Sequence, residues 1–483
     1  MNYRNLWYYL SATVLIVAVF MVVPAVIALC EGDYSTCLAF ALTMAGAAGI
    51  SLPGFLKKNK NRSLRSREGF ILVALAWVLV SLIGALPLYF SNRVPGFVNC
   101  LFEIASGFTT TGATVIGDVE ALPKSILYWR SFTHWLGGMG VLVFLLAISP
   151  TSSGDGLRIM RAESTGPEVN KLTPKTRQSA RILYGIYIGM TLLQFLFMLF
   201  GGIGVFDALL LTFATAGTGG FSLKNDSLVS YSPYIQWVVG IFMLLFAVNF
   251  GVYYLLLMKQ PKKALLNEEL RFFLITVVCA TALMTIHILP ALNGNFSEAL
   301  RHGFFQVITI TSSAGFMTMD YNLWAPVCKA VIVLLMLIGA CAGSTGGGIK
   351  FSRVLILFKS IRAEIQRLLH PNAVVRVRLD RETVSPQTVT NVFAFVGAYG
   401  LLTILSVLII SFDGFSLESN LTAVISCLSN IGPGLDAFGP TQTFAAFSDL
   451  SKLVLTFDMI TGRLEIFPVL LMLIPSSWKK GRG

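Results

Sequence analysis

The sequence predicts an all-α membrane protein that crosses the bilayer many times, and three observations support this. The chain of 483 residues is 55% hydrophobic and only 12% charged, whereas an average soluble domain carries about 25% charged residues. Its mean hydropathy is +0.74. Apolar runs of about 20 residues, long enough to cross a hydrocarbon core of about 30 Å, recur along the whole chain.

Composition argues against several other classes of protein. The net charge of +12 needs no nucleic acid, because excess Lys and Arg in a membrane protein usually marks cytoplasmic loops. The first apolar run is a full-length span without a small-residue cleavage site, unlike a secretory signal. Four scattered histidines form no metal-ligand pair. Seven cysteines lack CxxC spacing, and Cys30 and Cys37 either pair across a short loop or are small apolar filler.

Residues 1–68 are predicted to form an N-terminal transmembrane hairpin with a basic loop. Its two spans cover 6–29 and 38–56. The following segment, 57–67, reads KKNKNRSLRSR and is the strongest orientation signal in the chain. By the positive-inside rule, it places this loop, and therefore the N-terminus, in the cytoplasm.

From residue 69 onward a long–short–long pattern of apolar runs occurs four times. The four repeats are predicted to occupy 69–178, 179–268, 269–386 and 387–483. The short runs cover 97–108, 206–216, 299–311 and 417–428, and runs of this length are typical of re-entrant segments. The paired long runs cover 69–90 and 126–148, 182–200 and 235–258, 272–289 and a span from about 327, then 392–410 and 450–474. The predicted fold is four pseudo-symmetric helix–pore helix–helix repeats around one pore, plus the N-terminal hairpin.

This topology agrees with the charge distribution. The hairpin and the four pairs of long runs give ten crossings. All basic loops then lie on the cytoplasmic side: 57–68, 151–181, 259–271, 359–386 and the tail 479–483. Full-length spans in place of the short runs would make the basic loops alternate sides, against the charge rule.

Each short run ends in a turn that contains glycine, and the four turns align without gaps on Gly112, Gly220, Gly315 and Gly432. One such turn alone is better explained by close helix packing than by a filter. Four in register predict an ion filter, because irregular backbone at membrane depth is tolerated where it lines a cavity and carbonyls replace the water shell of a monovalent cation.

The residues before each glycine indicate which atoms act as ligands. The residue two positions before has a side chain able to hydrogen-bond: Thr110, Thr218, Ser313 or Asn430. The residue one position before does not keep this property, since it is Thr111, Gly219, Ala314 or Ile431. The ligands at that position are therefore predicted to be main-chain oxygens.

The third repeat contains a glycine-rich interruption. Residues 339–350 read GACAGSTGGGIK, and each glycine inside a helix costs about 1 kcal/mol, so the helix is predicted to break there. Ile349 separates the last glycine from Lys350, which departs from the phosphate-loop pattern. The predicted role is a flexible gate beneath the filter, and the alternative is a static kink. The gate residues are Gly343, Ser344, Thr345, Gly346, Gly347 and Gly348.

Charged residues within apolar runs mark further candidates. Arg463, in the last span, is predicted to act as a barrier to cations, to pair with a carboxylate such as Asp458 or Glu465, or both. Glu103, in the first pore helix, is predicted to fix the filter by hydrogen bonds rather than to bind ions. The charged stretch 376–382 is either a solvated face or a docking site for a cytosolic partner.

Six motifs together resemble the Trk/Ktr/HKT superfamily of potassium transporters, and the N-terminal hairpin is similar to its bacterial TrkH/TrkG branch. The motifs lie at 109–114, 135–139, 343–348, 370–373, 430–434 and 462–465. The resemblance implies a pore-forming potassium uptake subunit of the bacterial inner membrane. It also implies a homodimer regulated by cytosolic nucleotide-binding TrkA-type subunits.

In that superfamily the four glycines coordinate K⁺, the glycine-rich loop gates, and the last-span arginine obstructs the pore. The resemblance assigns these roles to Gly112, Gly220, Gly315 and Gly432, to 343–348, and to Arg463. Glycine at the first filter position, where sodium-carrying relatives can have serine, implies a preference for K⁺. The second filter, 216–220, is richer in glycine than expected.

Besides a potassium uptake subunit, the sequence leaves two alternative functions. One is a sodium-selective or Na⁺/H⁺-coupled cation permease of the same superfamily. The other is a membrane-embedded enzyme, which would need a nucleophile–base pair or paired carboxylates at membrane depth. Glu103 and Glu465 belong to different repeats and have no histidine nearby in sequence, so the sequence favours a permease without covalent chemistry.

Overall fold

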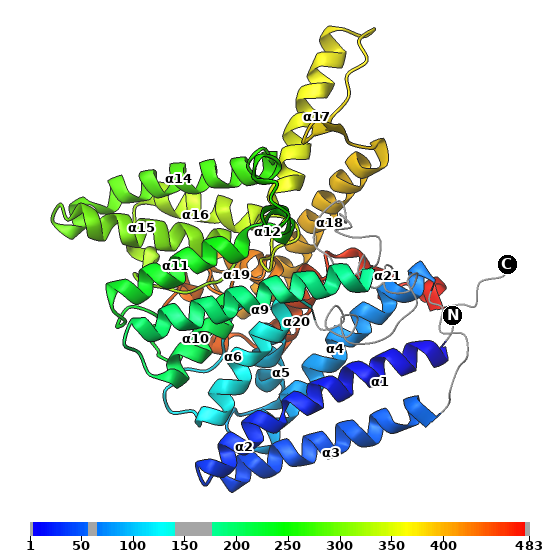
Figure 1. Cartoon of the computed structure of the whole chain (residues 1–483), viewed down its shortest axis with the longest axis vertical. Helices are drawn as coiled ribbons and strands as arrows, with labels where there is room; N and C mark the ends of the chain where they lie inside the picture. The colour runs from blue at the N-terminus through cyan, green and yellow to red at the C-terminus, as the bar shows by residue number, and fades with distance from the viewer. Residues whose placement is uncertain (1–2, 57–64, 141–175, 479–483) are drawn as a thin grey trace.

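The computed structural model describes residues 3–56, 65–140 and 176–478, and most of these residues are helical (Figure 1). The helices are α1 (Tyr3–Phe20), α2 (Val22–Cys30), α3 (Tyr34–Leu56), α4 (Ser66–Phe90), α5 (Phe97–Phe108), α6 (Lys124–Gly138), α9 (Thr176–Phe200), α10 (Val205–Ala216), α11 (Pro233–Ala247), α12 (Phe250–Leu257), α13 (Pro261–Leu265), α14 (Glu268–Ile288), α15 (Phe296–Thr311), α16 (Pro326–Ile338), α17 (Phe351–Leu369), α18 (Pro386–Ile410), α19 (Leu417–Leu428), α20 (Asp449–Arg463) and α21 (Phe467–Leu473). One small hairpin joins β1 (Arg378–Leu379) to β2 (Glu382–Thr383).

The N-terminal hairpin forms as predicted. Helices α1 and α2 together make one apolar span of 28 residues, Tyr3–Cys30, and α3 returns antiparallel beside it. Both α1 and α3 pack against α4, the first helix of the first repeat (Figure 1). All seven cysteines are free thiols in the structure, Cys30 and Cys37 included.

The four predicted pore helices are present, and two of them have the predicted bounds. They are α5, α10, α15 and α19, each between 12 and 16 residues long. Helix α15 begins at Phe296, three residues earlier than predicted, because Asn295 caps it by accepting a hydrogen bond from the Glu298 amide. Helix α5 packs against α20 as well as α4 and α6, so the first and fourth repeats are in contact.

The second long helix is shorter than its predicted span in every repeat, and a break was predicted only in the third repeat. In the described residues, six helices are long and apolar enough to cross a membrane, or seven if α11 and α12 count as one bent span. Helix α6 ends at Gly138, and residues 141–148 of its predicted span lie outside the described part of the chain. Helices α11 and α12 meet at 88°. Helix α16 ends at Ile338, and the last span divides into α20 and α21.

Local backbone conformation explains these breaks. Gly140 and Gly339 follow α6 and α16 with φ of +85° and +76°, a left-handed conformation that ends a helix and that glycine adopts freely. Glu465 and Ile466 separate α20 from α21 with φ of +57° and +67°. Such values are costly for a side chain with a Cβ, especially a branched one, so surrounding contacts must hold this second break.

The predicted basic loop 359–386 is also corrected, because its first part belongs to a helix. Helix α17 runs from Phe351 to Leu369 and projects away from the rest of the molecule (Figure 1). Its basic residues and its apolar residues follow each other at helical spacing, as in an amphipathic helix. The prediction counted only the number of basic residues, so it took this segment for a loop. The basic segments 57–64, 151–175 and 479–483 lie outside the described residues.

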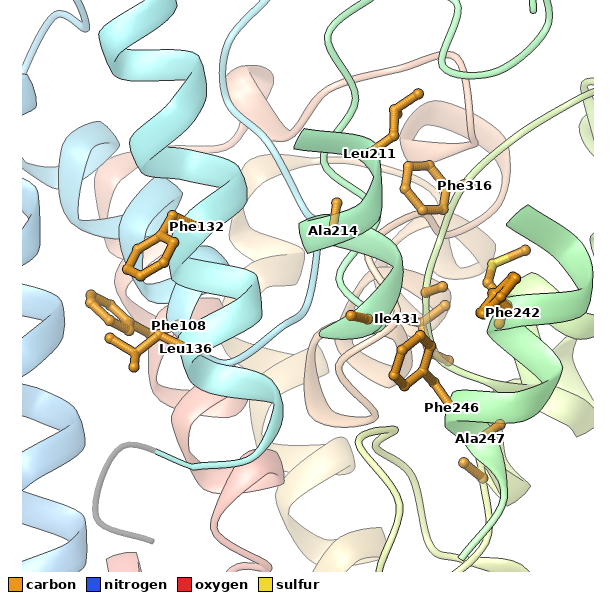
Figure 2. Packing of buried hydrophobic residues seen from close by; sticks show 14 of the residues in the cluster. Phe108, Phe132, Leu136, Leu211, Ala214, Phe242, Phe246, Ala247, Phe316 and Ile431 are labelled. Atoms are coloured by element: carbon orange, nitrogen blue, oxygen red, sulfur yellow. The ribbon is translucent and has the colours of Figure 1, made fainter. Parts of the chain in front are cut away.

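The apolar core surrounds the ends of the pore helices. Phe108, at the end of α5, packs against Trp129 of α6, and both residues belong to one buried cluster. Figure 2 shows one group of this cluster at Phe108, Phe132 and Leu136, and others on α10 and α11 near Ile431. This packing leaves the irregular turns after the pore helices enclosed by protein rather than lipid, as backbone at membrane depth requires.

Candidate functional site

All four pore helices end in the same hydrogen-bonded turn. The residue two positions before each aligned glycine donates its N–H to the carbonyl of the residue five positions before that glycine. The residue one position before the glycine donates its N–H to the carbonyl of the residue six positions before it. In the first repeat these bonds are Thr110 N to Gly107 O, 3.1 Å, and Thr111 N to Ser106 O, 2.9 Å. This is a Schellman motif, which places the residue after the helix cap in a left-handed conformation.

The left-handed position is occupied in every repeat by a residue other than glycine. The φ values are +57° at Thr110, +54° at Thr218, +60° at Ser313 and +54° at Asn430. A left-handed residue other than glycine costs about 1–3 kcal/mol and persists where its surroundings enforce it. Four equal conformations at equivalent positions show that the repeats predicted from the sequence share one turn geometry.

The aligned glycines form a closed ring, which we call the four-glycine ring. A Cβ added to Gly112 would lie 2.0 Å from the carbonyl oxygen of Gly219, and the same contact recurs at the other three seams. The distances are 1.9 Å from Gly220 to Ala314 O, 2.1 Å from Gly315 to Ile431 O, and 2.7 Å from Gly432 to Thr111 O. Eight of the nine residues predicted for the filter therefore meet in one place, with Thr110 directly before them in the chain, and main-chain carbonyls alternate with glycines around the ring.

The loops that follow the ring are also joined in a circle. Phe444 N donates to Thr114 O (2.8 Å), which joins the fourth repeat to the first. Hydrogen bonds also bridge the other three seams, among them Val119 N to Asn225 Oδ1 at 2.8 Å, Leu228 N to Met317 O at 3.0 Å, and Tyr321 Oη to Gly434 O at 3.1 Å. These loops surround a cavity of about 160 Å³ that is lined by all four glycines of the ring.

The predicted side-chain hydrogen bonds two positions before the glycines form in three repeats. Thr218 donates to Gly217 O at 2.6 Å, and Ser313 Oγ accepts from Gly347 N at 2.6 Å. Asn430 donates to both Thr111 Oγ1 (3.0 Å) and Met459 O (2.8 Å). The hydroxyl of Thr110 has no hydrogen-bond partner among the described residues. These side chains thus mainly support neighbouring backbone.

Glu103 fixes the first turn, as predicted. Its carboxylate accepts hydrogen bonds from Thr114 Oγ1 and Val115 N, each at 3.0 Å, directly after the ring. Arg130 on α6 donates its Nε to the same carboxylate at 2.8 Å, and both side chains are at least 98% buried. The guanidinium also lies 4.1 Å from the ring centroid of Phe221, in the second repeat.

Replacing Glu103 with Gln is expected to destabilise the protein by about 3–5 kcal/mol, because it leaves Arg130 as a buried charge without its carboxylate. Thermal unfolding of purified protein measures this. The double variant Glu103→Gln, Arg130→Met removes both charges and is expected to recover much of the loss. A single variant as stable as the parent chain would show that this pair does not hold the turn.

His134 connects the first two repeats behind the ring. Its Nδ1 lies 2.8 Å from Gly107 O, and its Nε2 lies 3.3 Å from Phe221 N. A carbonyl only accepts and a backbone amide only donates, so the two contacts together require a neutral ring protonated at Nδ1. The ring is fully buried, and a Cβ at Gly219 would lie 2.2 Å from it. Glycine at this position therefore makes room for the histidine.

The glycine-rich loop, residues 339–350, lies directly against the inner ends of the filter turns. Gly347 N donates to Ser313 Oγ, and a Cβ at Gly347 would lie 2.1 Å from Ser429 O. A Cβ at Gly346 would lie 2.6 Å from Ser312 O. The small residues predicted to form a gate thus allow the loop to touch the third and fourth repeats where their pore helices end.

The glycine-rich loop also binds the carbonyls that the broken helices expose. Cys341 N donates to Ala247 O (3.1 Å), and Thr345 Oγ1 donates to Phe246 O (3.2 Å), at the end of α11. Ile349 N and Lys350 N donate to the last turn of α16. Helix ends at membrane depth need such partners because no bulk water is available.

Arg463 connects the glycine-rich loop to the first repeat. Its guanidinium donates to Thr345 O at 2.7 Å and to Gly137 O and Gly138 O, both at 2.6 Å. The side chain is 7% exposed. The carbonyls of Gly137 and Gly138 belong to the C-terminal end of α6, where the helix dipole favours a cation. Of its predicted carboxylate partners, Glu465 forms an ion pair with Arg353, and Asp458 accepts a hydrogen bond from Ser406.

Sequence reasoning named the ring, the loop and Arg463, but it missed two supporting side chains. Arg130 lies within the predicted span 126–148, so a buried charge was visible there and pointed to a functional site. His134 carries no such signal, because a single histidine among apolar residues has no spacing that identifies its contacts. In the described residues no cluster of three metal-ligating side chains is present.

Comparisons with known proteins show which family and which fold the chain resembles. A family model described as TrkH, a cation transport protein, matches residues 36–480. The Trk system potassium uptake protein TrkH of Salmonella typhimurium (strain LT2) is 34% identical, over 99% of this chain and 100% of its own. TrkG of Escherichia coli K12 is 34% identical over 88% of each. The crystal structure of the potassium transporter TrkH from Vibrio parahaemolyticus superposes with a TM-score of 0.89 at 30% identity, covering 99% and 100% of the two chains.

Proposed function

The chain belongs to the TrkH family of cation transport proteins, and from this premise we propose that it is the pore-forming subunit of a potassium uptake system. Its relatives are named as potassium transport proteins, and the family consists of transporters rather than enzymes. The single observation that carries the proposal is the closed four-glycine ring, in which each repeat contributes one glycine and one carbonyl to its seams.

The proposed filter is the four-glycine ring with the residues before each glycine. Carbonyl oxygens of Thr111, Gly219, Ala314 and Ile431 lie at the seams, and backbone carbonyls suit a dehydrated monovalent cation. Four pore helices direct their C-terminal ends to the ring, and these ends carry partial negative charge. The transported ion K⁺ is then the only ligand that the site needs, and the membrane potential, about 2.3 kcal/mol per charge per 100 mV, drives its entry.

The proposed gate is the glycine-rich loop together with Arg463. The loop lies against the inner ends of two filter turns, and Arg463 holds it at Thr345 O. A cation that leaves the ring inward meets this loop and a fixed positive charge. Conduction therefore requires the loop to move, and the hydrogen bonds to Ser313, Arg463 and α11 are what must break.

The proposed setting is the bacterial inner membrane, with both termini in the cytoplasm. The basic residues of α17 and of the adjoining hairpin support this orientation. We propose a homodimer regulated by cytosolic nucleotide-binding TrkA-type subunits on this face. The exposed charged stretch 376–382 and the projecting α17 offer a contact surface there (Figure 1).

Rubidium uptake tests the proposal. Expression of the chain in a bacterial strain that lacks its own potassium uptake systems is expected to restore growth at low potassium and to produce labelled rubidium uptake that potassium inhibits. Empty vector is the control. Failure of a membrane-inserted protein to restore either property would contradict the function.

Sodium competition separates the second candidate function from the first. A sodium-selective or Na⁺/H⁺-coupled permease remains the alternative within the same superfamily. Glycine at the first filter position favours potassium, so a tenfold excess of sodium is expected to leave rubidium uptake nearly unchanged. Strong inhibition by sodium, or uptake that requires it, would favour the alternative.

A further inference from the structure

Glu269 is a buried carboxylate that contacts the residues on either side of segment 343–351, which includes most of the glycine-rich loop. It lies in the first turn of α14 and is 4% exposed. Its Oε1 accepts a hydrogen bond from Ala342 N at 2.7 Å and another from Ser352 N at 2.9 Å. Ala342 immediately precedes Gly343, and Ser352 lies in the first turn of α17.

A single oxygen atom therefore closes residues 343–351 into a loop with fixed ends. Ala342 lies in the break between α16 and α17, and Ser352 lies in the first turn of α17. The backbone N–H of each therefore has no acceptor within a helix. Hydrogen bonds to a charged acceptor are about twice as strong as neutral ones. The loop can leave its place beneath the filter only by stretching or losing these two bonds.

The same turn of α14 is attached to the cytoplasmic hairpin. Asp380, at the tip of the β1–β2 hairpin, accepts hydrogen bonds from Glu268 N and from Asn267 Nδ2, each at 2.7 Å. The carboxylate of Glu268 also forms an ion pair with Lys359 on α17. The backbone unit that carries Glu269 is thus fixed from the cytoplasmic side by a residue 112 positions away in sequence.

We propose that Glu269 is a positioning residue that keeps the glycine-rich loop closed, and that Asp380 connects this anchor to the exposed hairpin. A displacement of the hairpin moves the first turn of α14, and Glu269 with it, so the two ends of the loop are released together. The role of Glu269 in transport rests on the proposed gate. Its role in holding the glycine-rich loop closed does not depend on that proposal.

Cys341 gives a readout of the anchor that does not depend on transport. It precedes Ala342 in the loop and is 1% exposed. In the full-length chain with the other six cysteines replaced by Ser, Cys341 is the only thiol. Its rate of modification by a charged, membrane-impermeant methanethiosulfonate reagent, applied to inside-out vesicles, reports how often the loop opens. Rubidium flux in the same vesicles reports conduction.

Glu269→Ala is expected to raise the rate of Cys341 modification about a hundredfold or more, as the loss of two hydrogen bonds to a charged acceptor implies, and to raise rubidium flux. Glu269→Gln keeps an acceptor oxygen and about half of that hydrogen-bond strength, so its rate is expected to lie about tenfold above that of the parent chain. Equal rates in Glu269→Ala and the parent would overturn the anchor. A Gln variant as fast as the Ala variant would overturn the hydrogen-bond explanation.

Asp380→Gly tests the connection to the hairpin, and Arg381→Gly is its matched control. Both residues have positive φ, +50° and +68°, so glycine fits either position. Only Asp380→Gly is expected to accelerate Cys341 modification, and equal rates in the two variants would overturn the connection.

Faster modification of Cys341 in Glu269→Ala without a change in rubidium flux would support the role of Glu269 in holding the loop and contradict the proposed gate. The Gln and Gly variants decide the outcome if Glu269→Ala fails to insert.

Discussion

Gly112→Ser is expected to lower the ratio of potassium to sodium permeation by about tenfold or more. The Cβ of the new residue would lie 2.0 Å from the carbonyl oxygen of Gly219, a distance that no real Cβ contact tolerates. Gly112 also has φ of +84°, which a side chain disfavours. The seam between the first two repeats must open, and a wider ring coordinates the smaller, more strongly hydrated sodium ion through retained water.

Gly117→Ser is the matched control for this substitution. Gly117 lines the same outer cavity, five residues later, but a Cβ there meets no atom within 4 Å. Rubidium and sodium fluxes in proteoliposomes give the permeation ratio of each variant. The same ratio in Gly112→Ser and Gly117→Ser, with equal amounts of inserted protein, would contradict the assignment of the filter.

Arg463→Ala is expected to raise potassium flux about tenfold. The substitution removes a fixed positive charge beneath the ring, where a unit charge about 10 Å away changes a cation's energy by about 1–2 kcal/mol at an effective dielectric constant near 20. It also releases Thr345 O from its hydrogen bond, so the glycine-rich loop loses one of its contacts. Both consequences act in the same direction.

Arg463→Lys separates the two consequences. Lysine keeps the charge but donates from one nitrogen, so it cannot reproduce the separate hydrogen bonds from two guanidinium nitrogens to the loop and to α6. A barrier made by charge predicts a flux near that of the parent chain for Arg463→Lys, and a barrier made by the hydrogen bonds predicts a flux near that of Arg463→Ala. Unchanged or lower flux in a normally inserted Arg463→Ala would remove Arg463 from the barrier altogether.

The ring and the breaks beneath it belong to one arrangement. The second long helix of each repeat ends or bends close to the inner side of the filter turns. Three of these ends present backbone carbonyls that are bound by the glycine-rich loop or by Arg463. The loop thus replaces missing helical hydrogen bonds with contacts that can open, which suits a gate better than a continuous helix would.

Local patterns were sufficient for the repeat and the filter. Pore helices α5 and α19 have the predicted bounds because a short apolar run followed by a polar turn has few other solutions in a bilayer. The alignment on Gly112 and its three counterparts needed only the spacing of glycines and polar residues. The hydrogen bonds of Glu103 also followed from the sequence, since a carboxylate in a buried pore helix needs nearby donors.

The sequence by itself determined that four equivalent glycine turns follow four short helices, because the hydrophobic period and the placement of glycine are properties of the chain near each turn. Only the tertiary structure decided how the turns are held. The pairs Gly112–Gly219, Glu103–Arg130 and Glu269–Ala342 join residues that are 27 to 107 positions apart. Their contacts depend on how the repeats close around the axis, and no local pattern encodes that closure. The four-glycine ring is therefore visible in the sequence as a set of positions, and it becomes a closed ring only when the fourth repeat meets the first.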